Sequence, residues 1–295
     1  MRAICSPNEK TIGGKQMSNI HVTSEIKTLK KVLLHRPGEE LLNLTPDTLG
    51  ELLFDDIPDL YEAQVEHDRF AKILRDNGVE VVYLEDLMAE TLDAHPEIKE
   101  QFLDQWLVES GVHTAEYHKI IKDYLAKFTN NKELVLKTMA GITFREIGEI
   151  HTNFLVDRLE TNSHLLVNPM PNLYFTRDPF ASVGNGAVIN RMYSVTRNRE
   201  TIYADYIFRF HPEYAGNVPD LYGRNNHFHI EGGDVLNVNE KLLFIGISQR
   251  TQAEAIQDLA MKMFYENEGN KIETILAFNI PNSRAFMHLD TVFTQ

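Results

Sequence analysis

A repeated plan in the second half of the chain constrains its fold more than any other feature. Residues 178–189 begin with an aspartate, continue as an apolar strand, pass through a glycine-containing turn and end in a second apolar strand. Residues 234–245 repeat that order, with the aspartate and the final isoleucine at the same spacing. Residues 290–293 begin a third copy, in which we expect another strand. Strand units that recur along a chain are typical of modules arranged around an axis, with ligands bound where the modules meet.

The third copy has no second strand before the chain stops at Gln295. A strand without its hairpin partner leaves an exposed edge, which proteins generally avoid. We therefore expect the sequence to be C-terminally truncated.

Helical patterns alternate with these strands and predict an α/β protein. Residues 29–35 and 79–84 are predicted strands, with a helix between them that Asp59 caps and Gly78 ends. Residues 251–266 open with a capping-box pattern and predict a helix that leads into a strand at residues 272–278. Strand, helix and strand in succession indicate the α/β class.

A block without strand signals interrupts this alternation. Helical spacing covers residues 97–110, 114–128 and 131–140, and glycine or asparagine residues break it between them. We interpret the block as an inserted helical subdomain. The predicted parts are residues 1–16, a disordered leader or tag; residues 17–84, the first part of the α/β fold; residues 85–150, the inserted helical subdomain; and residues 151–295, the further modules.

Composition limits the partners and the compartment. The 295 residues contain 43 acidic and 29 basic side chains, a formal charge of −14, which argues against nucleic acid and suits cationic small ligands. No apolar run is long enough to span a membrane, and no signal peptide precedes the first strand. The only cysteine is Cys5, so a reducing cytoplasm is the expected location.

The stretch at residues 227–234 (His-Phe-His-Ile-Glu-Gly-Gly-Asp) is the strongest candidate for a binding site. Polar and apolar residues alternate up to Glu231, which predicts a strand. Two glycines then lie between two carboxylates, so that a ligand or a second segment can approach the backbone closely. The negative charge on both sides suits a cation, either a metal ion, an ammonium or a guanidinium.

The repeats place further polar residues at matching points. Asp178, Glu231, His288 and Asp290 converge if the modules surround an axis, and His288 and Asp290 leave the same face of a predicted strand. In one interpretation, His227, His229 and Glu231 bind a divalent metal for a hydrolase or oxygenase. In the other, the carboxylates grip a planar guanidinium while His288 acts as general acid and base, and no cofactor is needed.

Four motifs resemble those of the arginine deiminases. They are residues 170–179 (Met-Pro-Asn-Leu-Tyr-Phe-Thr-Arg-Asp-Pro), 231–234 (Glu-Gly-Gly-Asp), 247–251 (Ile-Ser-Gln-Arg-Thr) and 287–290 (Met-His-Leu-Asp), in the order that the family has. Residues 51–56 and the helical block also resemble that family, and the likeness covers about residues 20–295.

The resemblance implies a five-bladed α/β propeller of the pentein type with an inserted helical subdomain, incomplete in this chain. It implies hydrolysis of L-arginine to L-citrulline and ammonia, through a thiouronium intermediate and without metal or cofactor. It assigns the guanidinium to Asp178 and Asp290 and the proton transfers to Glu231 and His288. The matching substrate-pocket positions are Leu53, Asn172, Phe175, Arg197 and Arg250, with the arginines available for the substrate carboxylate. Arg177 alternates to the other face, and we expect a structural role for it.

The family's nucleophile is a cysteine in a glycine-containing loop near the C-terminus, and this sequence stops before it. We therefore expect the 295 residues alone not to turn over arginine. A non-catalytic binder of guanidino compounds is the alternative. The resemblance leaves room for a homo-oligomer of the full-length protein.

Overall fold

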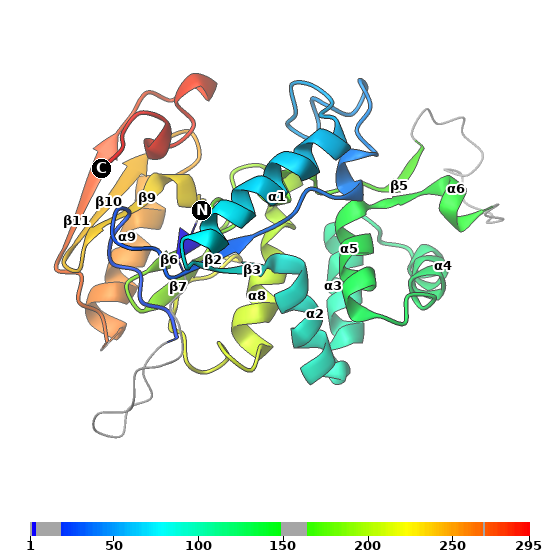
Figure 1. Ribbon diagram of the computed structural model, residues 1–295, viewed down its shortest axis with the longest axis horizontal. Helices are drawn as coiled ribbons and strands as arrows, with labels where there is room; N and C mark the ends of the chain where they lie inside the picture. The colour runs from blue at the N-terminus through cyan, green and yellow to red at the C-terminus, as the bar shows by residue number, and fades with distance from the viewer. Residues whose placement is uncertain (1, 4–18, 149–163, 268) are drawn as a thin grey trace.

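Three similar modules account for most of the strands. The computed structural model describes residues 2–3, 19–148, 164–267 and 269–295, and its strands form three three-stranded sheets and one two-stranded sheet (Figure 1). In each larger sheet two strands pair antiparallel, and a third strand pairs in parallel with the second strand after a helical crossover. The predicted α/β class is confirmed.

The modules follow one another along the chain. The first contains β1 (Arg2–Ala3), β2 (Lys31–Leu34), α1 (Leu60–Asp76) and β3 (Glu80–Tyr83). The second contains β6 (Phe180–Val183), β7 (Gly186–Ile189), α7 (Val195–Asn198), α8 (Thr201–Phe210) and β8 (Asp220–Tyr222). The third contains β9 (Val235–Asn239), β10 (Leu242–Ile247), α9 (Ala253–Met261) with a π-helical turn (Lys262–Glu266), and β11 (Thr274–Asn279).

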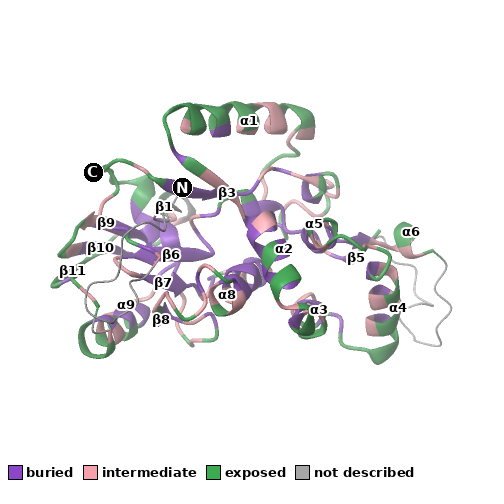
Figure 2. Ribbon diagram, turned by 60° about the horizontal axis from the view of Figure 1, so that its bottom comes forward, coloured by how far each residue is buried: buried purple, intermediate pink, exposed green. Residues whose placement is uncertain are grey.

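Local signals explain the predicted boundaries of the first module. The Asp59 carboxylate accepts a hydrogen bond from the Glu62 amide at the start of α1, and Gly78 follows the helix with φ of 79°. The helix lies on the outside of the molecule, and of its residues only Ala71 is buried (Figure 2). Residues 2 and 3 of the predicted leader form β1, and its other residues, Cys5 among them, lie outside the described residues.

The region between the first two modules is mostly helical. It contains α2 (Leu84–Ala94), α3 (Lys99–Glu109), α4 (Ala115–Leu125), α5 (Asn131–Ala140), α6 (Phe144–Ile147) and the short strands β4 (Ile142–Thr143) and β5 (Leu165–Val167). The three predicted helices are confirmed. Helix α2 was missed because it follows β3 directly, and its cap residue Tyr83 makes no side-chain capping bond. Strand β4 was missed because it has only two residues.

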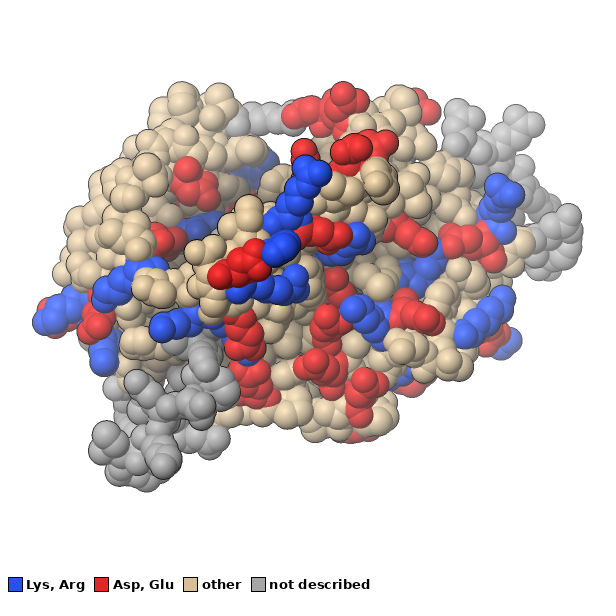
Figure 3. All heavy atoms as spheres, in the orientation of Figure 1, with Lys and Arg blue, Asp and Glu red and all other residues tan. Residues whose placement is uncertain are grey.

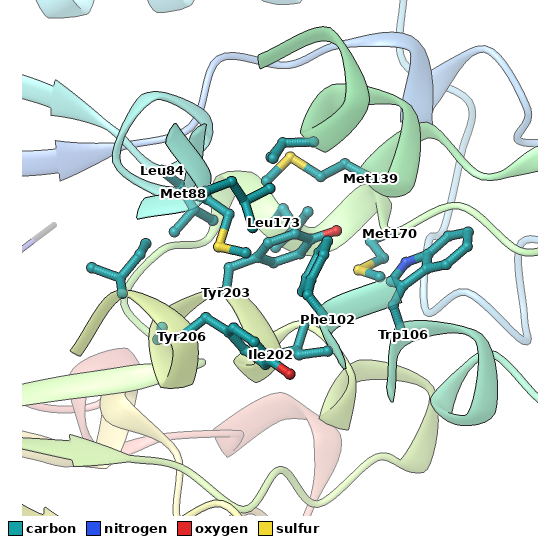
Figure 4. Packing of buried hydrophobic residues seen from close by; sticks show 14 of the residues in the cluster. Leu84, Met88, Phe102, Trp106, Met139, Met170, Leu173, Ile202, Tyr203 and Tyr206 are labelled. Carbon is teal, nitrogen blue, oxygen red and sulfur yellow. The ribbon is translucent and has the colours of Figure 1, made fainter. Parts of the chain in front are cut away.

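These helices share one apolar core with the second module (Figure 4). Phe102 and Trp106 from α3 and Met139 from α5 pack in the same cluster as Tyr203 from α8. The Trp106 indole donates to the Thr138 carbonyl at 3.1 Å, and the Tyr203 hydroxyl lies 3.0 Å from the Thr138 hydroxyl. The Trp106 indole and the Tyr203 hydroxyl are thus paired within this core.

The core also holds the segment that leads into the second module. The Met170 amide donates to the carbonyl of Met139 at the end of α5, at 2.9 Å. Gly141 has φ of 77°, and a Cβ there would lie 2.5 Å from the Val167 carbonyl oxygen. The close approach requires glycine at this position and fixes the start of residues 168–178.

A second apolar cluster joins the second and third modules. Val188 from β7 and Leu221 from β8 are in the same buried cluster as Val235, Leu243 and Ile256 of the third module. This packing brings the residues that precede β6 and β9 into one region.

Three local predictions were wrong. Residues 227–231 are not a strand, because the Ile230 amide bonds to the Arg191 carbonyl and the His229 amide to the Gln252 side chain. The expected strand at residues 290–293 begins instead with a 3-10 helix, η8 (Leu289–Thr291). The expected capping box of α9 does not form, because Gln252 is its cap residue and makes no side-chain capping bond.

The two repeats have the same spacing in sequence, but the strand pairing in their hairpins differs by one residue. Ile189 pairs with Phe180, two positions after Asp178, whereas Ile245 pairs with Val235, one position after Asp234. An irregularity at Leu242 in the second hairpin makes up the difference.

Acidic and basic side chains are interspersed over the face seen in Figure 3, although the chain is strongly acidic. None of the described helices is both long enough and apolar enough to cross a membrane.

Candidate active site

Glu231 is the centre of a buried polar cluster between the second and third modules. It precedes the 3-10 helix η5 (Gly232–Asp234) in an extended conformation, and it is fully buried. Its amide donates to the Thr251 hydroxyl at 3.1 Å. Its carboxylate accepts from the Tyr193 amide at 3.0 Å and lies 2.8 Å from Nε2 of His288. The acid and the imidazole are therefore in hydrogen-bond contact.

The glycine and the aspartate of the same turn fit His288. A Cβ on Gly233 would lie 2.5 Å from His288 Nδ1, so only glycine leaves space for the ring. One oxygen of Asp234 accepts from the Leu289 amide at 2.8 Å, and the other accepts from the Ser248 hydroxyl at 2.6 Å. The turn therefore fixes both the side chain and the following backbone of His288.

Ser248 connects Asp234 to the backbone of Arg250. The hydroxyl of Ser248 accepts from the Arg250 amide at 2.9 Å and from the Thr251 amide at 3.1 Å. The Arg250 guanidinium lies over the Tyr193 ring, 5.3 Å from its centroid, and its Nη1 is 3.7 Å from Glu231. Its Nε is buried and has no hydrogen-bond partner. A buried donor without a partner is rare and points to a missing acceptor.

Asp178 completes the cluster from the second module. Its Oδ1 lies 3.9 Å from His288 Nδ1, while its Oδ2 accepts from Arg197 Nη1 at 2.9 Å. Arg197 also donates to Glu200 at 3.0 Å and to the Asn172 carbonyl at 3.4 Å. The buried guanidinium of Arg197 thus holds Asp178 in place and has most of its donors in use.

The cluster favours a protonated imidazole. Burial lowers the pKa of His288, but the hydrogen bond with Glu231 and the negative charges of Asp178, Glu231 and Asp234 outweigh it and raise the pKa above its usual value. Burial raises the pKa of Asp234 to about 6, against the opposing hydrogen bonds from Ser248 and Thr251. The raised pKa of His288 favours its imidazolium form.

Asp290 lies beside this cluster rather than within it. Its side chain is 34% exposed, and its Oδ2 is 3.5 Å from Arg177 Nε. Burial raises the pKa of Asp290, and the charges of His288 and Arg177 partly offset that rise. The expectation that His288 and Asp290 share one face of a strand was wrong, because Asp290 lies in η8.

The other predicted pocket residues have varied surroundings. Leu53 has φ of 63°, the left-handed region that non-glycine residues rarely adopt, and it follows a residue whose carbonyl accepts from Asn172 at 2.8 Å. Phe175 is exposed, and its ring centroid lies 3.9 Å from that of Tyr174. Sequence reasoning did not identify Tyr193 as a contact of the site, because no motif includes it and its backbone amide makes the contact.

A metal site at His227 and His229 finds no support. His227 is exposed, and His229 Nδ1 is 2.8 Å from the Arg250 carbonyl. In the described part of the chain, the group whose ligand atoms could hold a metal is Asp178, Glu231 and His288, within 4.8 Å of one another. That group already contacts positively charged arginines.

Comparisons with known proteins agree with the motifs. The family model described as arginine deiminase matches residues 50–295. The arginine deiminase of Treponema denticola is 58% identical over 279 residues, which cover 95% of this chain and 68% of that protein. The arginine deiminase of Streptococcus agalactiae serotype Ia is 53% identical over 282 residues, with the same two shares.

A solved structure of DDAH from Pseudomonas aeruginosa, complexed with citrulline, has a TM-score of 0.43 and 16% identity. The match covers 88% of this chain and 63% of that chain.

The fold and the cluster define an α/β repeat protein with a buried carboxylate–imidazole site between modules. The extent and identity of the sequence matches then settle the family: this chain belongs to the arginine deiminases.

Proposed function

We propose that this chain forms the guanidinium-binding part of a site that converts L-arginine and water into L-citrulline and ammonia. The observation that carries the proposal is the buried pair of Glu231 and His288 beside Asp178. A carboxylate matches the forked N–H donors of a guanidinium, and Oδ1 of Asp178 faces the cluster while Arg197 occupies its Oδ2. Asp290, at the edge of the cluster, supplies the second carboxylate.

The roles of the residues follow from their environments. Glu231 and His288 exchange protons with the guanidinium nitrogen that leaves as ammonia and with the water that replaces it. Attack on the guanidinium carbon needs a nucleophile, for which the family resemblance implies a thiolate. The only cysteine of the 295 residues is Cys5, which lies outside the described residues. We propose that the 295 residues bind arginine without turning it over.

The surroundings of Arg250 favour a ligand that carries a carboxylate. Its buried Nε lacks an acceptor, and its Nη1 lies 3.7 Å from the Glu231 carboxylate. The α-carboxylate of free arginine would supply that acceptor, together with the pocket residues Leu53, Asn172 and Phe175. Arg197 acts mainly by holding Asp178.

We also propose that the three modules are parts of a five-bladed α/β propeller with residues 85–150 as its helical insertion. The shared order of antiparallel pair, helix and parallel strand supports this arrangement. As the family resemblance implies, we also propose that the enzyme is cytoplasmic and uses no metal or cofactor.

Calorimetric titration tests the binding site. We expect the chain to bind L-arginine and to bind agmatine, which lacks the carboxylate, at least about tenfold more weakly, since a hydrogen bond to a charged group contributes roughly 1.5–3 kcal/mol. Arg250→Met should remove the difference between the two ligands, whereas the surface control Arg209→Met should keep it. Equal affinities for arginine and agmatine would exclude the role given to Arg250.

A citrulline assay tests whether the 295 residues turn over arginine. The 295-residue chain should form no citrulline above a His288→Ala control, and citrulline formation above that control contradicts the proposal. A stoichiometric metal in the purified protein, lost in His288→Ala, would favour a metal site instead.

A further inference from the structure

The guanidinium of Arg177 contacts three separate segments around the candidate site. Nε donates to the Gly232 carbonyl at 3.1 Å, and Nη2 donates to the Val235 carbonyl at 2.9 Å. Nη1 donates to the carboxylate of Glu25 at 3.2 Å, and Nε lies 3.5 Å from Asp290. The side chain is only 18% exposed. Alternation along the sequence suggested a purely structural residue, but these contacts surround the cluster.

Two of the contacts bracket the turn that carries Glu231. Gly232 is the first residue of η5, and Val235 follows its last residue. A guanidinium is a rigid planar fork, so donation to both carbonyls fixes the two ends of the turn relative to each other. The same turn presents Glu231 to Nε2 of His288 and leaves the space at Gly233 that the imidazole ring occupies.

The other two contacts connect the turn to its surroundings. Glu25 belongs to an N-terminal segment whose amide donates to the Asn237 carbonyl in β9 at 2.9 Å, and its carboxylate accepts from the Asn237 amide at 2.8 Å. Asp290 lies in η8, directly after the segment that carries His288. Arg177 therefore touches both sides of the contact between Glu231 and His288.

We propose that Arg177 is a positioning residue, which holds the Glu231 turn against His288 and keeps Asp290 at the edge of the site. Its role in catalysis rests on the proposed function. The effect of Arg177 on the protonation of His288 is independent of the proposed function, because that effect requires only the observed contacts.

The substitution Arg177→Lys tests the geometry without changing the charge. An ammonium is a compact point charge and cannot hold both carbonyls in the fixed geometry of the fork. A looser contact between Glu231 and His288 removes stabilisation of the imidazolium, so we expect the pKa of His288 to fall by on the order of one unit. Side-chain NMR of the 295-residue chain measures this pKa, with the His288 signal assigned from its loss in His288→Gln.

The direction of the shift distinguishes position from charge. Removal of a nearby cation alone would raise the pKa of His288, so a fall in Arg177→Lys reports geometry. The control Arg36→Lys alters a similar forked pair, with Asp68 on the surface, and should leave the His288 pKa unchanged. An unchanged or raised pKa in folded Arg177→Lys overturns the proposal.

Two variants at Glu25 keep the test decisive if Arg177→Lys does not fold. Glu25→Ala and Glu25→Gln both remove the carboxylate charge, but only the glutamine keeps an oxygen that can accept from Arg177, so the His288 pKa should be lower in Glu25→Ala than in Glu25→Gln. Equal His288 pKa values in these two variants overturn the proposal. A lowered His288 pKa in Arg177→Lys with unchanged arginine affinity would contradict the proposed function but not the positioning role.

Discussion

The buried carboxyl group of Asp234 predicts a pH dependence of stability with a definite sign. Its pKa is about 6 in the folded protein, because burial disfavours the charged form, and 3.8 is its ordinary value. Between these values the folded state binds a proton that the unfolded state does not, so this group's contribution to stability falls as pH rises. From pH 4 to pH 6 the loss amounts to about 2 kcal/mol.

The substitution Asp234→Asn removes this titration and retains an oxygen that can accept from the Leu289 amide. The free energy of unfolding of the variant, minus that of the unsubstituted chain, should therefore rise by about 2 kcal/mol between pH 4 and pH 6. Urea denaturation at a series of pH values measures the difference, in which the other acidic groups largely cancel.

The control Asp68→Asn should behave in the opposite way. The hydrogen bond from Arg36 lowers the pKa of Asp68, so its contribution to stability is lost as pH falls, and its exposure keeps the effect small. A difference for Asp234→Asn that stays constant within about 0.5 kcal/mol over the same range refutes the assignment of a raised pKa.

Two further substitutions test the packing around the site and the first module. Gly233→Ala should destabilise the protein by about 1–3 kcal/mol in chemical denaturation, because its Cβ would overlap the His288 ring. Gly223→Ala, where a Cβ meets nothing within 4 Å, should have little effect, and equal losses in both variants would contradict the argument. His35→Leu should cost about 3–5 kcal/mol, since the buried ring lies 2.8 Å and 3.0 Å from two buried carboxylates that would lose their partner. A melting temperature within a few degrees of the original would contradict that expectation.

Local signals determined which elements of the fold could be predicted. Helix α1 was predicted because the residues next to its two ends, Asp59 as the cap and Gly78 as the stop, are local signals in the sequence. Residues 227–231 were predicted wrongly because alternation indicates an extended chain but not its hydrogen-bond partner. The partners there are the Arg191 carbonyl and the Gln252 side chain, which only the folded chain brings near.

The sequence predicted which residues form the candidate site, but not which of their side chains bond to one another. The repeat and the motifs singled out Asp178, Glu231 and His288, which the structure brings within 4.8 Å of one another. The sequence could not indicate that Arg197 uses its donors on Asp178 and Glu200, or that Arg177 contacts the turn at Gly232. Those pairings depend on the packing of separate modules.

The contact between Glu231 and His288 joins residues that are 57 positions apart in the chain. Closing so long a loop costs chain entropy before the contact forms, so contacts of this kind tend to form late in folding. A ligand that binds the cluster would then stabilise the native state more than the folding transition state. Bound arginine would therefore slow the unfolding of the protein and leave its refolding rate nearly unchanged.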